Sequence, residues 1–204
     1  MNAPAKHIEE MLQDAGINPI AGVDEAGRGP CAGPLVIASV ILGNPFADVW
    51  AEMRDSKEIS EKKREVLFDV VMENAAAVSV IEVSPHEIDS RGVHAANLDG
   101  MRRAVNGLSL TPAYVLTDGY AIEGLAVPNL AVWKGDQVVT AISAASIIAK
   151  VTRDRIMREL DAIYPGYGFA GHKGYITAAH TKAIAELGIT PIHRKSFSNI
   201  AALL

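Results

Sequence analysis

The sequence contains a single cysteine, Cys31, so it can form neither an internal disulfide nor a cysteine-rich zinc site. It also lacks long apolar runs, and residues 34–42, one of the longest, are far too few to span a bilayer. Residues 1–13 hold no continuous apolar segment and include Glu9 and Glu10, so we expect no signal peptide. No heptad repeat indicates a partner helix. These absences predict a cytoplasmic monomer that binds no membrane.

Several common catalytic and cofactor patterns are missing as well. The six histidines never show the His-Glu-x-x-His spacing of zinc proteases. Gly27-Arg28-Gly29 matches neither a P-loop nor a dinucleotide fingerprint, because the required spacings are absent. Cys31 stays open as a nucleophile, although a small thiol in an apolar turn is more typical of a buried, inert side chain. The acidic residues are therefore the better place to look for chemistry.

The composition describes one globular domain with a sizeable core. The chain has 204 residues, of which 49% are hydrophobic and 21% charged, which excludes disorder as the default. Its net charge of −5 speaks against a nucleic-acid partner, but the charge is unevenly spread. Residues 150–204 hold eight Lys and Arg against four Asp and Glu, and residues 1–149 hold eleven against twenty. Acidic groups for metal and basic groups for phosphate suit a nuclease, although the charge alone favours an ordinary acidic protein with a mixed surface.

The hydrophobic pattern predicts an α/β domain of alternating strands and helices. Strands are expected at residues 20–24, 35–42, 77–83, 113–117 and 130–133. Helices are expected at residues 60–73, 95–105, 140–163 and 177–187, with a short helix beginning after Ser84. The N-caps expected for three helices are Ser60, Ser84 and Thr177. In the first helix we expect Val66, Leu67 and Val70 to share one face, and small residues in the helix at 140–163 indicate close packing on a sheet.

Acidic residues follow three of the predicted strands. Asp24-Glu25, Asp118 and Asp136 each come after an apolar strand and next to glycine. If these strands are neighbours, four carboxylates meet at one place, and their repulsion at close range is relieved by divalent cations. Mg²⁺ prefers oxygen ligands of this kind. The alternative is that Asp and Glu in these positions are ordinary turn residues.

Six blocks of sequence, in order, resemble bacterial ribonuclease HII. The blocks are AGVDEAGRGPCAGPLV at 21–36, RDSKEIS at 54–60, LTDGY at 116–120, VWKGDQVVTAISAASIIAKVTRD at 132–154, HKGYITAAH at 172–180 and PIHRKSF at 191–197. The resemblance runs from about Ile20 to Phe197, nearly the whole chain. It implies a ribonuclease H-like fold with a mixed central sheet flanked by helices, in a single domain. The core would span about residues 20–162, and residues 163–204 would form a C-terminal helical extension that contributes to substrate binding.

The resemblance also implies an activity and a cofactor. Members of this family hydrolyse the RNA strand of RNA/DNA hybrids and cut on the 5′ side of single ribonucleotides in duplex DNA, leaving 3′-hydroxyl and 5′-phosphate ends. The implied mechanism uses two Mg²⁺ or Mn²⁺ ions. The implied metal ligands and catalytic residues are Asp24, Glu25, Asp118 and Asp136. The implied partners are RNA/DNA hybrids and ribonucleotide-containing DNA, whereas a sliding clamp has only weak support in residues 198–204.

Substrate contacts are expected from two further regions. The resemblance implies that Gly27-Arg28-Gly29 and Tyr175 sense the junction between RNA and DNA, since glycines allow close approach to the 2′-hydroxyl. Lys57, Lys150 and Lys173 are candidate phosphate contacts, and the weaker candidates are Arg153, Arg158, His193, Arg194 and Lys195. For Tyr175 the alternative is a packed, partly buried ring, and for the basic residues it is a solvated surface.

A few positions depart from the commonest family pattern. They are Thr117 and Tyr120 around the third acid, Glu58-Ile59, and the segment His94-Ala95-Ala96-Asn97. None of them is an expected metal ligand, so only local contacts are in doubt. Two other functions stay open at this point. One is a ribonuclease H-fold nuclease with another substrate, and the other is a nucleic-acid-binding module without catalysis.

Overall fold

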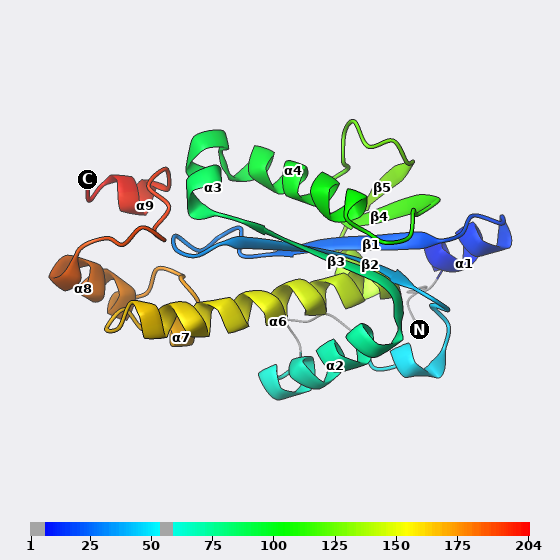
Figure 1. The fold of residues 1–204 in the computed structure, drawn as a ribbon, viewed down its shortest axis with the longest axis horizontal. Coiled ribbons are helices and arrows are strands. Elements are labelled where there is room, and N and C mark those ends of the chain that lie inside the picture. Colours follow the sequence, from blue (N-terminus) through cyan, green and yellow to red (C-terminus); the bar gives the residue numbers. More distant parts are fainter. Residues whose placement is uncertain (1–6, 54–58) are drawn as a thin grey trace.

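One mixed sheet of five strands carries the fold in the computed structural model, which describes residues 7–53 and 59–204 (Figure 1). The strands are β1 (Ile20–Ala26), β2 (Leu35–Leu42), β3 (Ala75–Val83), β4 (Tyr114–Asp118) and β5 (Asn129–Val132). They lie in the order β3-β2-β1-β4-β5. β1 pairs antiparallel with β2 and β2 with β3, whereas β1, β4 and β5 are parallel. The predicted mixed sheet is confirmed.

Helices cover both faces of this sheet. α3 (Pro85–Arg91) and α4 (Val93–Asn106) lie on one face, and α2 (Glu61–Asn74) and α6 (Thr140–Ile163) lie on the other (Figure 1). β2 is buried along its whole length, because each of its faces meets one of the two helical layers. Its uninterrupted apolar sequence follows from that double covering.

The long helix α6 packs unusually close to β1. A Cβ atom added to Gly22 would lie 2.1 Å from the carbonyl carbon of Ala141, a distance too short for any residue other than glycine at this position. The start of α6 consists of small residues, and all of residues 140–149 are buried. The close approach that the small residues predicted is therefore found, and it sets the distance between α6 and the strand that carries two of the acids.

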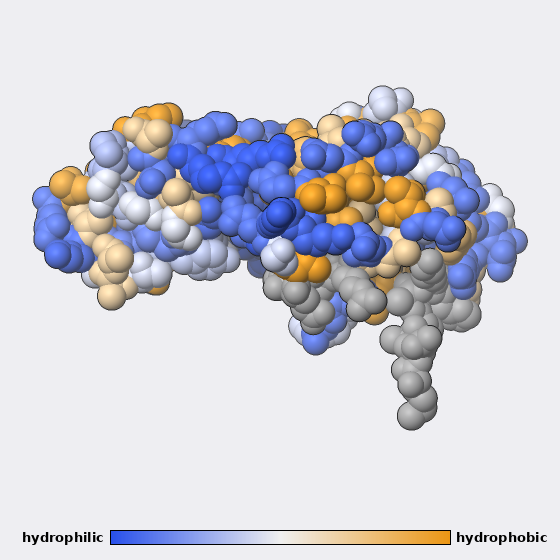
Figure 2. All heavy atoms as spheres, turned by 90° about the horizontal axis from the view of Figure 1, so that it is seen from below, coloured by the Kyte–Doolittle hydropathy of each residue, from blue (hydrophilic) through white to orange (hydrophobic). Residues whose placement is uncertain are grey.

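The N-caps predicted from the sequence are found as well. Ser60 accepts a hydrogen bond from the Lys63 amide at 3.3 Å, Ser84 from Glu87 at 3.1 Å and Thr177 from His180 at 3.1 Å. The inward face of α2 was predicted less well. Leu67 and Val71 are buried, whereas Val66 is 51% exposed. Figure 2 shows the molecule from the α2 side, where apolar atoms reach the surface beside strongly hydrophilic ones.

Glu25 and Asp136 sit in elements other than those expected. β1 continues to Ala26, because Ala26 still pairs with Val36 of β2, and Asp24 and Glu25 therefore lie inside the strand. Asp136 lies on a one-turn helix, α5 (Gly135–Val138), rather than directly at a strand end. Short elements of one or two turns, such as α5, have too few residues for a periodic pattern to predict them.

The chain after α6 forms further short helices at one end of the molecule (Figure 1). They are α7 (Phe169–His172), α8 (Ala178–Leu187) and α9 (Ser198–Ala201). Phe169, Ile184 and Ile200 pack in an apolar cluster with Ala32 and Met157, which ties these helices to the loop after β1. Among the helices of the described residues, none has the length and apolar character needed to cross a membrane.

An N-terminal helix that the sequence analysis did not predict, α1 (His7–Asp14), contributes a buried glutamate. Glu9 is only 1% exposed, and its two carboxylate oxygens accept hydrogen bonds from the amides of Thr140 at 2.8 Å and Ala141 at 3.0 Å. These amides belong to the first turn of α6, where unpaired N–H groups and the helix dipole favour a negative charge. Glu9 therefore caps α6 from 131 residues away.

We predict that Glu9→Ala lowers the free energy of unfolding by about 2 kcal/mol or more, because two buried amides lose a charged acceptor. Urea unfolding monitored by circular dichroism measures the loss. Glu10→Ala is the matched control, since its exposed neighbouring side chain should cost less than about 0.5 kcal/mol. Equal stabilities for the two variants would show that the Glu9 cap contributes nothing.

Candidate active site

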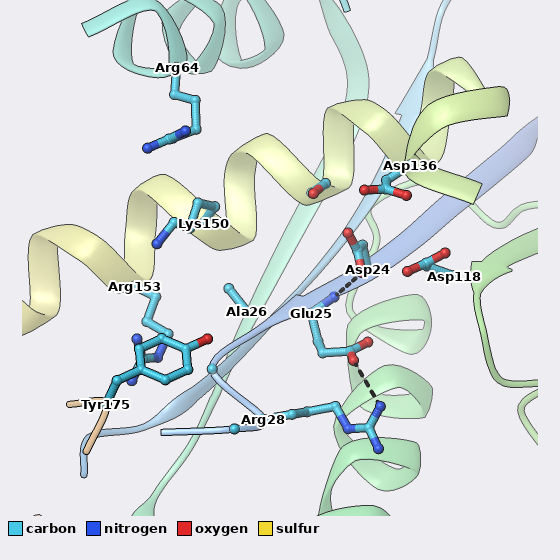
Figure 3. A pocket seen from close by; sticks show the side chains of 13 residues that line it. Asp24, Glu25, Ala26, Arg28, Arg64, Asp118, Asp136, Lys150, Arg153 and Tyr175 are labelled. Carbon is cyan, nitrogen blue, oxygen red and sulfur yellow. Dashed lines mark hydrogen bonds and ion pairs between the residues drawn. The ribbon is translucent and has the colours of Figure 1, made fainter. Parts of the chain in front are cut away.

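The four predicted acids come from three neighbouring segments of the structure. β1 and β4 are parallel and paired up to Val23 and Thr117, so Asp24 and Asp118 follow at matching positions. The Gly135 amide donates a hydrogen bond of 2.7 Å to the Asp118 carboxylate, which ties α5, and with it Asp136, to the end of β4. Figure 3 shows Asp24, Asp118 and Asp136 pointing toward a common space, with Glu25 beside them.

Two of these carboxylates, Asp24 and Asp136, are buried, and Glu25 and Asp118 are partly buried. Asp24 is 5% exposed, and burial raises its pKa well above the ordinary value, with further increases from Glu25 and Asp118. Burial also raises the pKa of Glu25, against the opposing effect of Arg28. Two features offset part of the cost: the Glu25 amide donates to Asp24 at 2.7 Å, and Arg28 forms an ion pair with Glu25 at 3.5 Å. The cluster remains short of positive charge.

The donor chemistry of the cluster fits a hard divalent cation. All four side chains offer only oxygen atoms, which Mg²⁺ and Mn²⁺ prefer. The Oε2 atom of Glu25 is buried, and no well-formed hydrogen bond to it is found within residues 7–53 and 59–204. In the same residues no three His, Cys, Asp or Glu side chains are gathered closely enough to hold a metal ion by themselves. An open site that keeps water and substrate oxygens as ligands is the kind that Mg²⁺ occupies.

A hollow of about 490 Å³ connects the acids with most of the predicted substrate residues. Besides the four acids, its lining includes Gly27, Arg28, Gly29, Arg64, Lys150, Arg153 and Tyr175. Lys150 also forms an ion pair of 2.8 Å with Asp154. Lys173 is absent from this lining, and its ammonium group donates to the Ala170 carbonyl. Lys57 lies outside the described residues.

A buried arginine explains the first glycine of the Gly27-Arg28-Gly29 loop. Arg153 is almost fully buried and donates to the carbonyls of Pro34 at 3.0 Å and Ala32 at 3.2 Å. A Cβ on Gly27 would lie 2.0 Å from Nε of Arg153, and the φ of Gly27 is +101°. Packing against Arg153 therefore requires a glycine at position 27, a reason other than the close approach to substrate expected from the sequence. Burial lowers the pKa of Arg153 to about 10, so it stays protonated near neutrality.

Arg194 was predicted as a candidate phosphate contact, and the structure contradicts this. It is fully buried, and its guanidinium donates to the Gly33 carbonyl at 3.0 and 2.9 Å and to the Arg28 carbonyl at 3.2 Å. It holds the loop between β1 and β2 from inside. Of the other weak candidates, Arg158 pairs with Glu65 at 2.9 Å. Lys195 is exposed, and it is its backbone amide that donates to Asp89 at 2.9 Å.

Two histidines that sequence reasoning missed as a pair hold the backbone of Tyr175. The Thr190 amide donates to Nδ1 of His193 at 2.9 Å, so the proton of this ring is on Nε2. His193 Nε2 then donates to His180 Nε2 at 3.1 Å, which leaves the His180 proton on Nδ1, where it bonds the Tyr175 carbonyl at 2.9 Å. Both rings are neutral in this chain of hydrogen bonds. His193 was predicted as a phosphate contact, but it is buried, so that prediction is wrong.

The comparisons with known proteins agree on one family. The family model described as Ribonuclease HII matches residues 21–200. A Ribonuclease HII from Mycobacterium avium is 54% identical over 193 residues, which cover 95% of this chain and 84% of that protein. The crystal structure of the ribonuclease H2 from Pyrococcus horikoshii superposes with a TM-score of 0.80 and 29% identity, covering 91% and 97% of the two chains. The structure of a PCNA:RNase HII complex from Archaeoglobus fulgidus superposes with a TM-score of 0.76 and 27% sequence identity. The match covers 89% of this chain and 96% of that chain.

We predict that Asp24→Asn raises the melting temperature of the metal-free protein. The substitution removes buried negative charge while its amide oxygen can still accept the Glu25 amide. A gain of about 1 kcal/mol corresponds to about 2–4 °C in a chain of this size. Thermal scans in chelator measure it, with exposed Glu73→Gln as control. Mg²⁺ should then stabilise the wild type more than the variant. A lower melting temperature for Asp24→Asn in chelator would contradict the charge clustering.

The buried histidines predict a pH dependence of stability. In the folded state the pKa of His193 is lowered from 6.5 to about 4, mainly by burial and secondly by the neighbouring His180. The native protein thus resists protonation, and the contribution of His193 is complete above pH 6.5 and decreases as the pH falls toward 4. Between about pH 8 and pH 5 the wild type should lose about 2 kcal/mol more than His193→Gln.

Urea unfolding at the two pH values gives this difference directly. Asp24 and Glu25 act with the opposite sign, because their raised pKa values favour the folded state at low pH, but they are present in both proteins and cancel. Exposed His86→Gln is the matched control and should keep the wild-type pH dependence. Parallel losses in wild type and His193→Gln would show that His193 is already protonated in the native state.

Proposed function

This chain belongs to the ribonuclease HII family, and from that premise we propose the substrates and products of its reaction. It is a ribonuclease H, a phosphodiester hydrolase for RNA paired with DNA. We propose that it also cuts duplex DNA on the 5′ side of a single embedded ribonucleotide and leaves 3′-hydroxyl and 5′-phosphate ends. The observation that carries this proposal is that one hollow joins the four acids, of which Asp24 and Asp136 are buried, to the Gly27–Gly29 loop and to Tyr175.

The acids are proposed as the metal-binding and catalytic groups. Asp24, Glu25, Asp118 and Asp136 would hold Mg²⁺ or Mn²⁺, two ions in the substrate complex. Such ions activate a water molecule and stabilise the leaving oxygen of a phosphodiester. The part of this chain is to keep the carboxylates ionised and in place. The Glu25 and Gly135 amides do this by donating to Asp24 and Asp118, and Lys150 on the same hollow is proposed to bind a substrate phosphate.

Tyr175 and the glycine loop are proposed to recognise the sugar at the junction. The Tyr175 side chain is 51% exposed, and a Cβ on Gly29 would lie 3.4 Å from its ring. The bare loop and the ring thus leave a narrow space whose walls are fixed by Arg194 on one side and by His180 on the other. A 2′-hydroxyl is the only group that distinguishes an RNA sugar from a DNA sugar, so a rigid, close-fitting space suits its recognition.

Further proposals concern the C-terminal segment, other protein partners, the oligomeric state and the location. Residues 163–204 are proposed to contribute to substrate binding as an extension of the core, since they supply Tyr175. Complex formation with PCNA is a property of the Archaeoglobus relative, and in this chain Ile200 is buried rather than part of an extended peptide. A monomeric state and a cytoplasmic location are proposed from the sequence alone, the latter because the single cysteine suits a reducing compartment.

We predict that the wild type cuts a DNA duplex with one ribonucleotide, and that Tyr175→Ala slows this cut more than it slows cleavage of a long RNA/DNA hybrid. Loss of ring contact should lower kcat/KM for the single-ribonucleotide duplex by about 5- to 100-fold, or about 1–3 kcal/mol. A hybrid offers many binding registers, so it should be affected less. Rates on both substrates and on plain DNA, resolved on sequencing gels, measure the preference and the position of the cut.

Two variants make this experiment decisive. Tyr175→Phe keeps the ring and isolates the hydroxyl group, and Asp24→Asn should cleave neither substrate at more than about one hundredth of the wild-type rate. Junction recognition is wrong if the wild type degrades the hybrid and ignores the lone ribonucleotide, or if Tyr175→Ala slows both equally. If Asp24→Asn cleaves at nearly the wild-type rate, the proposal that the acids are the metal-binding and catalytic groups is wrong.

A further inference from the structure

A second hollow adjoins the acids on the side away from Tyr175. Its volume is about 510 Å³, and it shares Glu25, Arg28, Asp118 and Asp136 with the first hollow. The first hollow extends from these residues toward Lys150 and Tyr175, which lie together at one end of the view in Figure 3. The second extends instead toward Tyr120, Trp133 and Lys134. The acids therefore lie between two continuous depressions.

The wall of this second hollow carries an exposed tryptophan. Trp133 is 82% exposed, more than any other large apolar side chain in the described residues. Tryptophan is normally well buried, and an exposed ring next to a functional site is typical of a binding surface. Lys134 follows it, also exposed and with a left-handed φ of 52°, a conformation that non-glycine residues adopt at a cost.

The position of Trp133 relative to the acids is fixed from both sides. Before it, the Val132 carbonyl accepts the Gly119 amide at 3.1 Å, next to Asp118. After it, the Gly135 amide donates to the Asp118 carboxylate at 2.7 Å. The left-handed turn at Lys134 lets the chain make both bonds within four residues. Trp133 thus projects from a rigid turn whose ends are both tied to Asp118 and its neighbour.

The opposite part of the hollow combines a cation with an aromatic ring. The Arg28 guanidinium lies 4.6 Å from the centre of the Tyr120 ring, and His94 packs edge-on against the same ring at 5.3 Å. Tyr120 and His94 are two of the positions that depart from the commonest family pattern. Aromatic faces and cations that alternate beside an acidic centre match the bases and phosphates of a nucleic acid.

We propose that Trp133, Lys134 and the Tyr120–Arg28 pair form a binding platform for the nucleotides on the 5′ side of the scissile phosphate. This inference rests on the proposed function, in which the cut lies on the 5′ side of the ribonucleotide and Tyr175 recognises the sugar at the junction, so that Tyr175 lies on the 3′ side of the scissile phosphate. A polynucleotide is continuous, so a strand whose cleaved phosphate sits at the acids leaves them in both directions. One direction leads to Tyr175, and the hollow under Trp133 lies along the other. The Trp133 indole contacts a base or sugar there, and Lys134 contacts a phosphate.

The protein contains its own reporter for a binding test, because its two tryptophans differ sharply in exposure. Trp50 is 3% exposed and its indole N–H is bonded to the Asn44 carbonyl at 2.7 Å. Iodide quenching of tryptophan emission therefore reports on Trp133. The probe is a DNA duplex with one ribonucleotide, mixed with full-length Asp24→Asn in Mg²⁺ so that cleavage is suppressed. We expect the duplex to shield the emission from iodide, and Trp133→Phe to abolish the iodide-sensitive part.

Affinity measurements with the same duplex test the energetic role. Trp133→Ala should raise Kd by about 5- to 100-fold, as expected for the loss of aromatic contact with a base, whereas Trp133→Phe should retain most of the affinity. Lys134→Gln should reduce the slope of log Kd against log salt by about one unit, the amount expected for the loss of one phosphate contact. In the cleaving enzyme, Trp133→Ala should raise KM with kcat within about twofold, since uniform binding is lost.

Shortened duplexes test the direction. Removing base pairs from the 5′ side of the ribonucleotide should erase the difference between wild type and Trp133→Ala, and removing them from the 3′ side should leave it. Unchanged iodide quenching at saturating duplex, equal affinities, or a difference that vanishes only on 3′ shortening would each overturn the platform. So would sedimentation showing a dimer that Trp133→Ala dissociates. Failure of the proposed function is seen separately, as a wild type that does not cut at a lone ribonucleotide.

Discussion

Negative charge held away from water is the constraint around which this fold is organised. Asp24 sits inside a central strand, and its pKa is raised by burial and by the acids beside it. A loop or a frayed strand end would relax under that repulsion and separate the charges. Here the acids cannot move apart, because strand pairing, the close contact of Gly22 with Ala141 and two backbone amides hold them. This repulsion would be relieved by a divalent cation, which is the physical basis for proposing a metal site at this place.

Two buried guanidinium groups hold the neighbouring loop in place. Arg153 and Arg194 donate to carbonyl groups of the segment that follows β1, where turns leave acceptors without partners in the sheet. The pKa of Arg194 is lowered to about 9, mainly by burial and secondly by repulsion from Arg153. Burying a charged guanidinium beside another one therefore costs free energy. Such a cost is acceptable where a rigid loop must stand beside a substrate. Arg153 and Arg194 therefore have a structural role, in holding the backbone of this loop.

Most strands, the long helices and the acidic quartet could be predicted because their signals are local. Apolar runs, N-caps such as Ser84, and acids beside glycines are all visible within a few residues of sequence. The missing features depend on contacts between distant segments. Nothing near Glu9 shows that it caps a helix 131 residues later, and nothing near Arg194 or His193 shows that the C-terminal segment folds inward over them. Charged and polar residues there were therefore assigned to the surface, their usual place.

The parallel pairing of β1 with β4 has a consequence for the birth of the protein on the ribosome. Asp24 is made early, but its neighbours Asp118 and Asp136 follow about a hundred residues later, and the Glu9 cap waits for Thr140. Contacts of such high sequence separation form late and slowly. A nascent chain can build the β1–β2–β3 meander, yet it has no assembled acid cluster until more than half of its length is out. The four acids can therefore come together only after Asp136 has been synthesised.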